Sequence, residues 1–248
     1  MSRGIVVRKC AGIEEFQRCV ALQREIWGEQ DIEVEPATLF VVASETGGQV
    51  LGAFDQDRLV GYTLALVGFA DGTVFLHSHM TGVCGDCRDR GVGRQLKLFQ
   101  REEALGRGIR LIVWTFDPLE TKNAHFNLNR LGAIARKYLP NLYGRTTSPL
   151  HLGLPTDRLW VEWQLDSARV VGAVSDLPTE PEAAAFAARI ALPGELDQWK
   201  QGATAEVAKV QARIREEFSA WFARGYAAIG VRKSSEGTAY LLAPWSDF

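Results

Sequence analysis

A turn rich in glycine and arginine occupies residues 83–96, which read Val83-Cys84-Gly85-Asp86-Cys87-Arg88-Asp89-Arg90-Gly91-Val92-Gly93-Arg94-Gln95-Leu96. It follows a hydrophobic run and opens an amphipathic helix. The first N–H groups of a helix have no partner inside it and lie at the positive end of its dipole, so they bind oxyanions well. Gly91 and Gly93 lack a Cβ, which lets phosphate oxygens approach the backbone. The stretch therefore predicts a phosphate site.

Three arginines strengthen this prediction, because a guanidinium can bind a phosphate through two parallel hydrogen bonds. They are Arg88, Arg90 and Arg94. A turn of this kind is a weak signal when it stands alone, since short motifs of glycine and arginine occur at many helix starts.

The sequence on either side of the turn has the composition of regular elements. Residues 73–83 have strand composition, and the helix after the turn places Val92, Leu96 and Phe99 on one face before it ends near Gly106 and Gly108. Residues 109–116 form a nearly continuous apolar run, typical of a strand buried on both faces. The turn is therefore expected inside a strand–turn–helix–strand unit.

These residues resemble the signature of the GNAT acyltransferase superfamily, which transfers acyl groups from acyl-coenzyme A. The signature has Arg or Gln, then Gly three residues on and Gly or Ala two further, and Arg88, Gly91 and Gly93 match it, with Val83 at the usual apolar position. A second match runs from Ala124 to Ala133. The other expected elements are a strand at Ile5–Arg8, a helix from about Ile13 to Trp27, a helical segment after Pro36, and strands at Val50–Asp55 and Leu59–Val67.

The resemblance covers about residues 1–166 and implies an α/β (α+β) fold, with a mixed central sheet flanked by helices. Within the superfamily, the chain is similar to a poorly characterised subgroup of predicted acetyltransferases. The runs that carry this closer likeness are His77-Ser78-His79-Met80, residues 114–119, Tyr143-Gly144 and residues 153–158.

Two positions depart from the superfamily pattern. Thr121 stands where many members have Asn, with Asn123 two residues on, and Leu128 stands where many have the Tyr that protonates the departing thiolate. The usual acid is therefore missing from its place.

The resemblance implies direct transfer, in which an amine attacks the thioester carbonyl and the enzyme supplies proximity and a donor to the developing oxyanion. The co-substrate is acetyl-CoA or another acyl-CoA, whose pantetheine arm pairs with a strand edge around residues 81–83. The residues expected to bind it are Thr81, Gly82, Val83, Arg88, Arg90, Gly91, Val92, Gly93, Arg94 and Asn123.

Three residues are candidates for the proton transfers. His79 is the first candidate base, because a histidine titrates near neutral pH. The alternative is that His77 and His79, which point to the same side of a strand, are hydrogen-bonded structural residues. Asp117, with Glu120, is the second candidate, since ligands collect beyond the carboxyl ends of strands, but its place before Pro118 also suits a turn. Tyr143 is the candidate acid, and packing in a Tyr-Gly turn is its alternative role.

The charge balance and hydropathy of the chain exclude some functions. It has 28 basic and 30 acidic residues, a net charge of −2, which argues against general nucleic-acid binding. We find neither a membrane-spanning run nor a secretory segment, so we expect a cytoplasmic protein without a membrane partner. The four cysteines, Cys10, Cys19, Cys84 and Cys87, are expected to be reduced thiols.

A zinc site is one reading of His77, His79, Cys84 and Cys87, and the expected geometry opposes it. At about 3.3 Å per extended residue, His79 and Cys84 would lie roughly 16 Å apart, too far to share one ion. We therefore expect no metal, and incidental loop cysteines or a redox pair remain as explanations for Cys84 and Cys87.

The sequence changes character after about residue 166, and residues 167–248 are expected to form a small helix-hairpin extension. A linker at Ser175–Pro181 and a short helix at Glu182–Arg189 precede a longer helix from about Val207 to Phe222, closed by Gly225. A hairpin of Tyr226–Val231 and Thr238–Leu242 follows. The extension has few apolar faces of its own, so it should pack on the first domain or on a partner subunit in a homodimer, as scaffold or as a wall of the acceptor pocket.

Two functions from different classes fit these observations. The first is an acyltransferase that moves an acetyl or other acyl group to an amine of a small molecule. The second is a catalytically degenerate GNAT-fold protein that binds acyl-CoA as a sensor or interaction module, which Leu128 at the Tyr position motivates. A purely structural role for the glycine turn is the third.

Overall fold

The computed structural model describes residues 4–28, 34–144, 152–175, 187–235 and 237–244. The chain divides into two compact units, Met1–Val113 and Trp114–Phe248, and each is described by itself. The sequence-based boundary near residue 166 lies inside the second unit. As a division between a family domain and an extension, that boundary stays a prediction.

The first unit is built on strands in the order β1-β2-β3-β4-β5. Their bounds are β1 Val6–Lys9, β2 Gln49–Asp55, β3 Arg58–Ala70, β4 Thr73–Val83 and β5 Leu111–Phe116, the last of which crosses the unit boundary. Neighbours are antiparallel except β4 and β5, which run parallel where Leu76 meets Ile112 and His77 meets Val113. A parallel pair needs a crossover, and the helix after the glycine turn supplies it.

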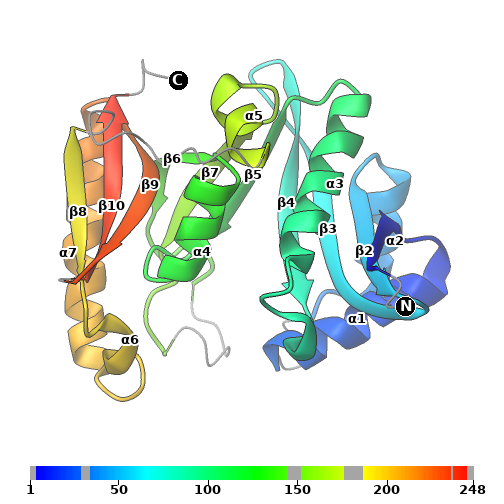
Figure 1. Ribbon diagram of the computed structural model, residues 1–248, viewed down its shortest axis with the longest axis horizontal. Helices are drawn as coiled ribbons and strands as arrows, with labels where there is room; N and C mark the ends of the chain where they lie inside the picture. Colours follow the sequence, from blue (N-terminus) through cyan, green and yellow to red (C-terminus); the bar gives the residue numbers. More distant parts are fainter. Residues whose placement is uncertain (1–3, 29–33, 145–151, 176–186, 236, 245–248) are drawn as a thin grey trace. The chain divides into compact units, whose positions relative to one another are not determined.

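Helices cover both faces of this sheet (Figure 1). They are α1 (Gly12–Trp27), α2 (Ala37–Glu45) and α3 (Val92–Gly106). Tyr62 of β3 packs edge-on against Trp27 of α1 and also meets Phe40 of α2. On the other face Leu96 of α3 is fully buried and lies close to Gly61 of β3. The apolar periodicity of each helix thus faces the sheet, as an amphipathic pattern requires.

Strand β4 contains a β-bulge at His79. Ser78 pairs with Ala65 and Met80 pairs with Leu64, so His79 has no partner across the ladder. The bulge reverses the alternation of side chains: Ser78 meets Lys97 of α3, whereas Met80 meets Tyr62 on the α1 face. Bulges bend a strand and re-aim a side chain, and they are frequent beside active sites.

The second unit has strands in the order β7-β6-β9-β10-β8. Its elements are α4 Thr121–His125, a π-helical turn at Phe126–Arg130, β6 Ile134–Leu139, β7 Arg158–Gln164, α5 Ala168–Val174, β8 Ala188–Pro193, α6 Leu196–Trp199, α7 Thr204–Ala223, β9 Tyr226–Ser234 and β10 Gly237–Pro244. In this unit α4 lies in front of the strands and α7 behind them in the view of Figure 1. A small apolar core joins Ile134 of β6 to Ile229 and Leu241 of the hairpin.

Most predicted elements are confirmed within two or three residues, including α1, α3, β4, α7 and the final hairpin. Gly225 takes φ 79° directly after α7, which is the left-handed conformation expected of a glycine at that place. Within the second unit, β9 pairs antiparallel with β6 at Ala228 and Ala135.

The prediction of a short helix at Glu182–Arg189 is wrong for the residues of that range that the structure describes. Ala188 and Arg189 belong to β8, which pairs antiparallel with β10, and its buried and exposed residues alternate. Cross-strand pairing therefore overrides the helix preference of alanine. Residues 182–186 of that helix and nearly all of the linker Ser175–Pro181 lie outside the described residues. No helix in the described ranges is both long enough and apolar enough to cross a bilayer.

Candidate active site

The turn predicted to bind phosphate, residues 83–91, ends in a glycine whose conformation and surroundings suit an anion. Gly91 has φ 78°, a left-handed conformation that favours glycine, and it stands immediately before α3. A Cβ placed on Gly91 would meet no atom within 4 Å, so the space beside it is open. The first bond of the helix runs from the Gln95 N–H to the Gly91 carbonyl at 3.0 Å. The amides of Val92, Gly93 and Arg94 therefore precede the helical ladder, as the sequence predicts for a phosphate site.

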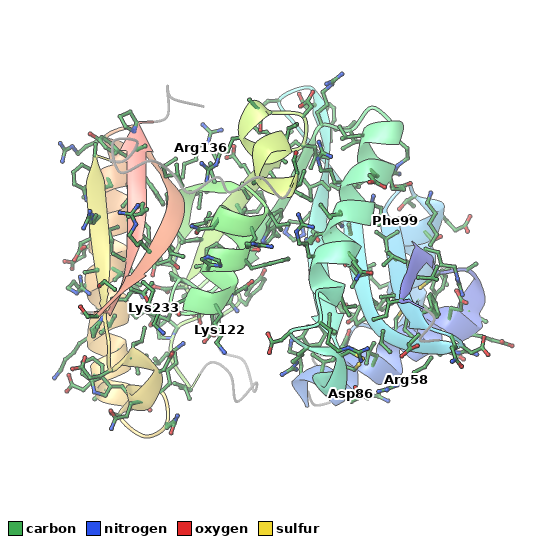
Figure 2. The ribbon with its side chains drawn as sticks, viewed as in Figure 1. Arg58, Asp86, Phe99, Lys122, Arg136 and Lys233 are labelled. Carbon is green, nitrogen blue, oxygen red and sulfur yellow. The ribbon has the colours of Figure 1, made fainter. Side chains whose placement is uncertain are left out.

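The loop before Gly91 is held by local contacts. The Cys87 N–H donates to the Cys84 carbonyl at 3.1 Å, closing a single 3₁₀ turn. Asp86 accepts two hydrogen bonds from Arg58 of β3, at 2.7 and 3.0 Å, and Figure 2 shows these two side chains together beside the start of α3. The Arg58 guanidinium lowers the pKa of Asp86. This exposed ion pair joins the loop to β3.

Two of the predicted arginines lie along the same turn and are exposed. Arg88 Nε donates to the Val83 carbonyl at 3.5 Å, and Arg90 Nη1 lies 3.7 Å from Cys87 Sγ. Arg94 is half-buried in the first turn of α3. The turn thus combines positive charge with helix amides that precede the first bond of α3.

The end of β4 presents a backbone edge. In the described part of the first unit, the register of β4 with β5 covers only Leu76 and His77, so residues 80–83 keep that edge free. Gly82 is required by packing, because a Cβ there would come within 2.8 Å of Ile26 and Trp27 of α1. Thr81 Oγ1 lies 3.1 Å from Thr63 Oγ1. A free edge of this kind can accept an extended ligand as an added strand.

His79 is paired with a residue that the sequence analysis missed. His79 Nε2 lies 2.9 Å from Oε1 of Glu35, and both side chains keep about a quarter to a third of their surface exposed, at 27% and 31%. The ring of His77 lies 6.1 Å from that of His79. Burial, together with the nearby charges of His79 and Lys97, lowers the pKa of His77 to about 4. His77 is thus kept neutral, while His79 has a carboxylate that can orient it.

A second missed group lies on α3 behind the bulge. Lys97 is buried at 4% exposure, and its Nζ donates to Ser78 Oγ at 2.7 Å and to Gln100 Oε1 at 3.0 Å. Burial lowers the pKa of Lys97 to about 7. A lysine at an inward position of the helix pattern was the one signal that could have revealed it.

In the second unit, Asp117 directly follows β5, and its side chain is half-buried. Its Oδ1 accepts a hydrogen bond from the Leu119 N–H at 2.8 Å, which is the turn contact expected before Pro118. Arg158 Nη1 lies 3.7 Å from Oδ2. Burial raises the pKa of Asp117. Glu120 instead forms an ion pair with Lys200 at 2.6 Å.

Tyr143 lies close to the same arginine. Its hydroxyl is 2.9 Å from Thr115 Oγ1 of β5, and the Arg158 guanidinium is 5.4 Å from the centre of its ring. The Tyr143 N–H donates to Thr156 Oγ1 at 2.9 Å. The structure therefore brings Asp117 and Tyr143 together around Arg158, while His79 belongs to the first unit.

The motif at residues 153–158 contains Asp157, which connects several segments of the second unit by hydrogen bonds. Asp157 is fully buried and accepts hydrogen bonds from Tyr138 at 2.7 Å, from the Asn141 N–H at 2.9 Å and from Arg215 of α7 at 2.9 and 3.0 Å. It links the Tyr143 loop to α7 in the C-terminal extension.

The two departures from the superfamily pattern can be located in the structure. Leu128 is fully buried, so it is part of the core of the second unit. Thr121 is half-buried at the first position of α4. Asn123, two residues on, is exposed on the same helix, and its Oδ1 accepts a hydrogen bond from Asn127 at 3.2 Å. Its expected part in binding the co-substrate stays a prediction.

Three potential metal ligands lie close together in the loop before Gly91. Among the residues that the structure describes, Cys84, Asp86 and Cys87 place one ligand atom each within 4.8 Å of one another, without either histidine. Burial, the first of several causes, raises the pKa of the Cys84 thiol to about 12, and Asp86 already accepts two bonds from Arg58. These features favour the neutral thiol over a metal-binding thiolate.

No protein-family model matches this sequence, and a search of curated proteins gave no significant match. Solved structures do match. The ribosomal-protein-S18-alanine N-acetyltransferase from Escherichia coli is 12% identical with a TM-score of 0.54, covering 66% of this chain and 96% of its own. A protein from Desulfovibrio desulfuricans assigned to the GNAT family of acetyltransferases is 16% identical with a TM-score of 0.53, covering 65% of this chain and 99% of its own.

A third similar structure is the NatC complex bound to Gag peptide and CoA, whose matching chain is 13% identical with a TM-score of 0.53. That match covers 65% of this chain and 99% of the other. At these identities the likeness concerns the fold. With its mixed sheet, its crossover helix after the glycine turn and its free β4 edge, this chain has the GNAT fold.

Proposed function

We propose that the protein is an acyltransferase that moves an acetyl or other acyl group from acyl-CoA to an amine of a small molecule. The observation that carries this proposal is the start of α3, where left-handed Gly91 borders open space and the amides of residues 92–94 precede the helical ladder. The diphosphate of coenzyme A suits such a site by its charge. Arg88 and Arg90 add charge, and the free edge of β4 suits the amide groups of pantetheine. Similar structures include acetyltransferases and one complex with CoA, which supports the same donor.

His79 is the proposed base. The β4 bulge re-aims its ring, and Glu35 at 2.9 Å can fix the tautomer that leaves one nitrogen free to accept a proton. In the reaction, the amine loses a proton to His79, its nitrogen forms a bond with the thioester carbon, and the carbon–sulfur bond breaks.

Tyr143 is the proposed acid that protonates the departing thiolate, in place of the tyrosine that Leu128 replaces. Its hydroxyl is held by Thr115 at 2.9 Å and its loop by Thr156. We keep Asp117 as a residue that interacts with the acceptor amine. The chain is proposed to work in the cytoplasm, without nucleic acid or membrane as a partner.

Isothermal titration calorimetry with acetyl-CoA tests the donor site. The native protein should release heat on binding, and Arg90→Glu and Gly91→Val should each weaken affinity about tenfold or more. Gly85→Ala is the matched control, because Gly85 lies in the same loop with ordinary φ and open space. Absence of heat with folded native protein would refute the proposal.

A thiol-release assay then tests turnover. Free coenzyme A should appear when a suitable small amine is added, and a panel of amines identifies the acceptor. Binding of acetyl-CoA without thiol release over the whole panel would instead indicate a binding protein without turnover.

A further inference from the structure

Cys84 and Cys87 are a Cys-x-x-Cys pair in the loop before Gly91, and the proposed function leaves both thiols unused. Both side chains are buried, at 0% and 1% exposure. Their sulfur atoms lie within 4.8 Å of each other. A disulfide joins two sulfurs at about 2.0 Å, so a short movement of one side chain would bring this pair to bonding distance.

The backbone between the two cysteines already has the length that a disulfide requires. Residues 85–87 form a single 3₁₀ turn, in which the Cys87 N–H donates to the Cys84 carbonyl at 3.1 Å. A 3₁₀ turn rises about 2.0 Å per residue and eclipses side chains that are three residues apart. By this geometry the two Cα atoms are about 6 Å apart, and disulfides span about 4.4–6.8 Å between Cα atoms. The bond can therefore form without rebuilding the loop.

One of the two sulfurs also contacts a cation. Arg90 Nη1 lies 3.7 Å from Cys87 Sγ, and the Arg90 side chain is exposed. A guanidinium in this place stabilises negative charge on the sulfur, and the thiolate is the form that reacts with oxidants. Because Arg90 is at the surface, displacement of its side chain opens a path to the sulfur below it. Cys87 is therefore the thiol that reacts first, with Cys84 as its partner.

We propose that Cys84 and Cys87 are a redox-sensitive pair that a peroxide converts to a disulfide, and that this bond weakens the binding of acyl-CoA at the start of α3. The Cys87 thiolate attacks one peroxide oxygen, the oxygen–oxygen bond breaks, and the sulfur becomes a sulfenic acid while the other oxygen leaves as water. The Cys84 sulfur then attacks the Cys87 sulfur, and the thiol proton leaves with the hydroxyl group as a second water. The peroxide gains the two electrons that the two thiols lose.

The effect on the phosphate site depends on which end of the pair can move. The Cys84 N–H donates to the Val60 carbonyl of β3 at 2.9 Å, so this end is anchored to the sheet. The new bond therefore draws Cys87 towards Cys84 and away from Arg90. Arg90 then loses a contact that restrains it beside the turn, and ordering a less restrained side chain on binding costs affinity. This consequence rests on the proposed function, whereas formation of the disulfide does not.

Mass spectrometry of the native protein after treatment with hydrogen peroxide, in the absence of any acyl-CoA, tests the disulfide. After free thiols are alkylated, the peptide that contains both Cys84 and Cys87 should appear unalkylated and lighter by two hydrogen atoms, and dithiothreitol should reverse this change. The double variant Cys84→Ser and Cys87→Ser should not show it. Cys10→Ala is the matched control and should still show it, because it removes the other close thiol pair, Cys10 and Cys19 with sulfurs 4.0 Å apart.

Calorimetry with acetyl-CoA on the same samples tests the effect on binding. The oxidised native protein should bind acetyl-CoA about fivefold or more weakly than the reduced protein. Dithiothreitol should restore the affinity. The double serine variant should bind equally well with and without peroxide treatment.

Three results would overturn the proposal. They are no disulfide between Cys84 and Cys87 in the native protein, a disulfide confined to Cys10 and Cys19, and equal acetyl-CoA affinity of the oxidised and reduced native protein. If the disulfide forms but neither form of the protein binds acetyl-CoA, the proposed function is refuted and the redox reaction of the pair stands.

Discussion

Lys97 Nζ lies 2.7 Å from Ser78 Oγ inside the first unit, which joins the crossover helix to β4 one residue before the bulge. A buried ammonium is unusual because removing its charge from water is costly. The hydroxyl and the Gln100 amide oxygen offset part of that cost. This contact makes the stability of the first unit sensitive to pH.

We expect the free energy of unfolding to rise between about pH 7 and pH 10 because of Lys97. Its pKa is lowered from 10.5 to about 7 by burial, so in this range the unfolded chain binds one more proton than the folded chain. The slope from this group reaches about 1.4 kcal/mol per pH unit. Urea unfolding at several pH values measures it. Lys97→Met should lose this slope, whereas Lys209→Met, at an exposed lysine, should keep it. The same slope in both variants would contradict the prediction.

Replacement of His79 by Gln should lower kcat/KM by about 100-fold or more, because general base catalysis is lost. Glu35→Gln should give a smaller loss, since the ring keeps a hydrogen-bond partner but no longer a charged one. Affinity for acetyl-CoA should change in neither variant. Steady-state kinetics combined with calorimetry checks this, and His125→Gln on the exposed face of α4 is the control. Unchanged kcat/KM in His79→Gln would exclude His79 as the base.

Tyr143→Phe should reduce kcat more than it changes KM, because it removes only the proton donor. Thr115→Val should have a weaker effect in the same direction, since it frees the Tyr143 hydroxyl from its partner. A thiol-release assay under saturating acetyl-CoA measures both. If Tyr143→Phe retains full kcat, the acid is another group.

Asp157→Asn should destabilise the second unit by about 2–3 kcal/mol, because it weakens a fully buried acceptor with several donors. Chemical denaturation measures the loss. Asp197→Asn, at a side chain that is 80% exposed, should change stability little. Equal effects of the two substitutions would show that the buried network adds nothing.

The local part of the fold could be predicted from the sequence, because it depends on periodicity and on glycine placement. The residues of β4, the phosphate turn and α3 show period-two and helical patterns next to two glycines, and the structure places them as expected. The strand β8 could not be predicted, since its alanine-rich start favours a helix and only pairing with β10 decides otherwise.

The candidate site was predictable only in its contiguous part. Glu35 and His79 are 44 residues apart, and no local pattern links them. Arg158 joins Asp117 and Tyr143 through packing of segments that are distant in sequence. The bulge at His79 could not be predicted from the residues of β4 alone, because it depends on how β4 pairs with β3.

His79 takes no part in the pairing register between β4 and β3. If it were deleted, Ser78 and Met80 would become consecutive residues opposite Ala65 and Leu64, which are already consecutive in β3. The pairing of β4 with β3 therefore does not require His79. We expect a variant without His79 to keep the pairing of β4 with β3 and to lose the proposed base.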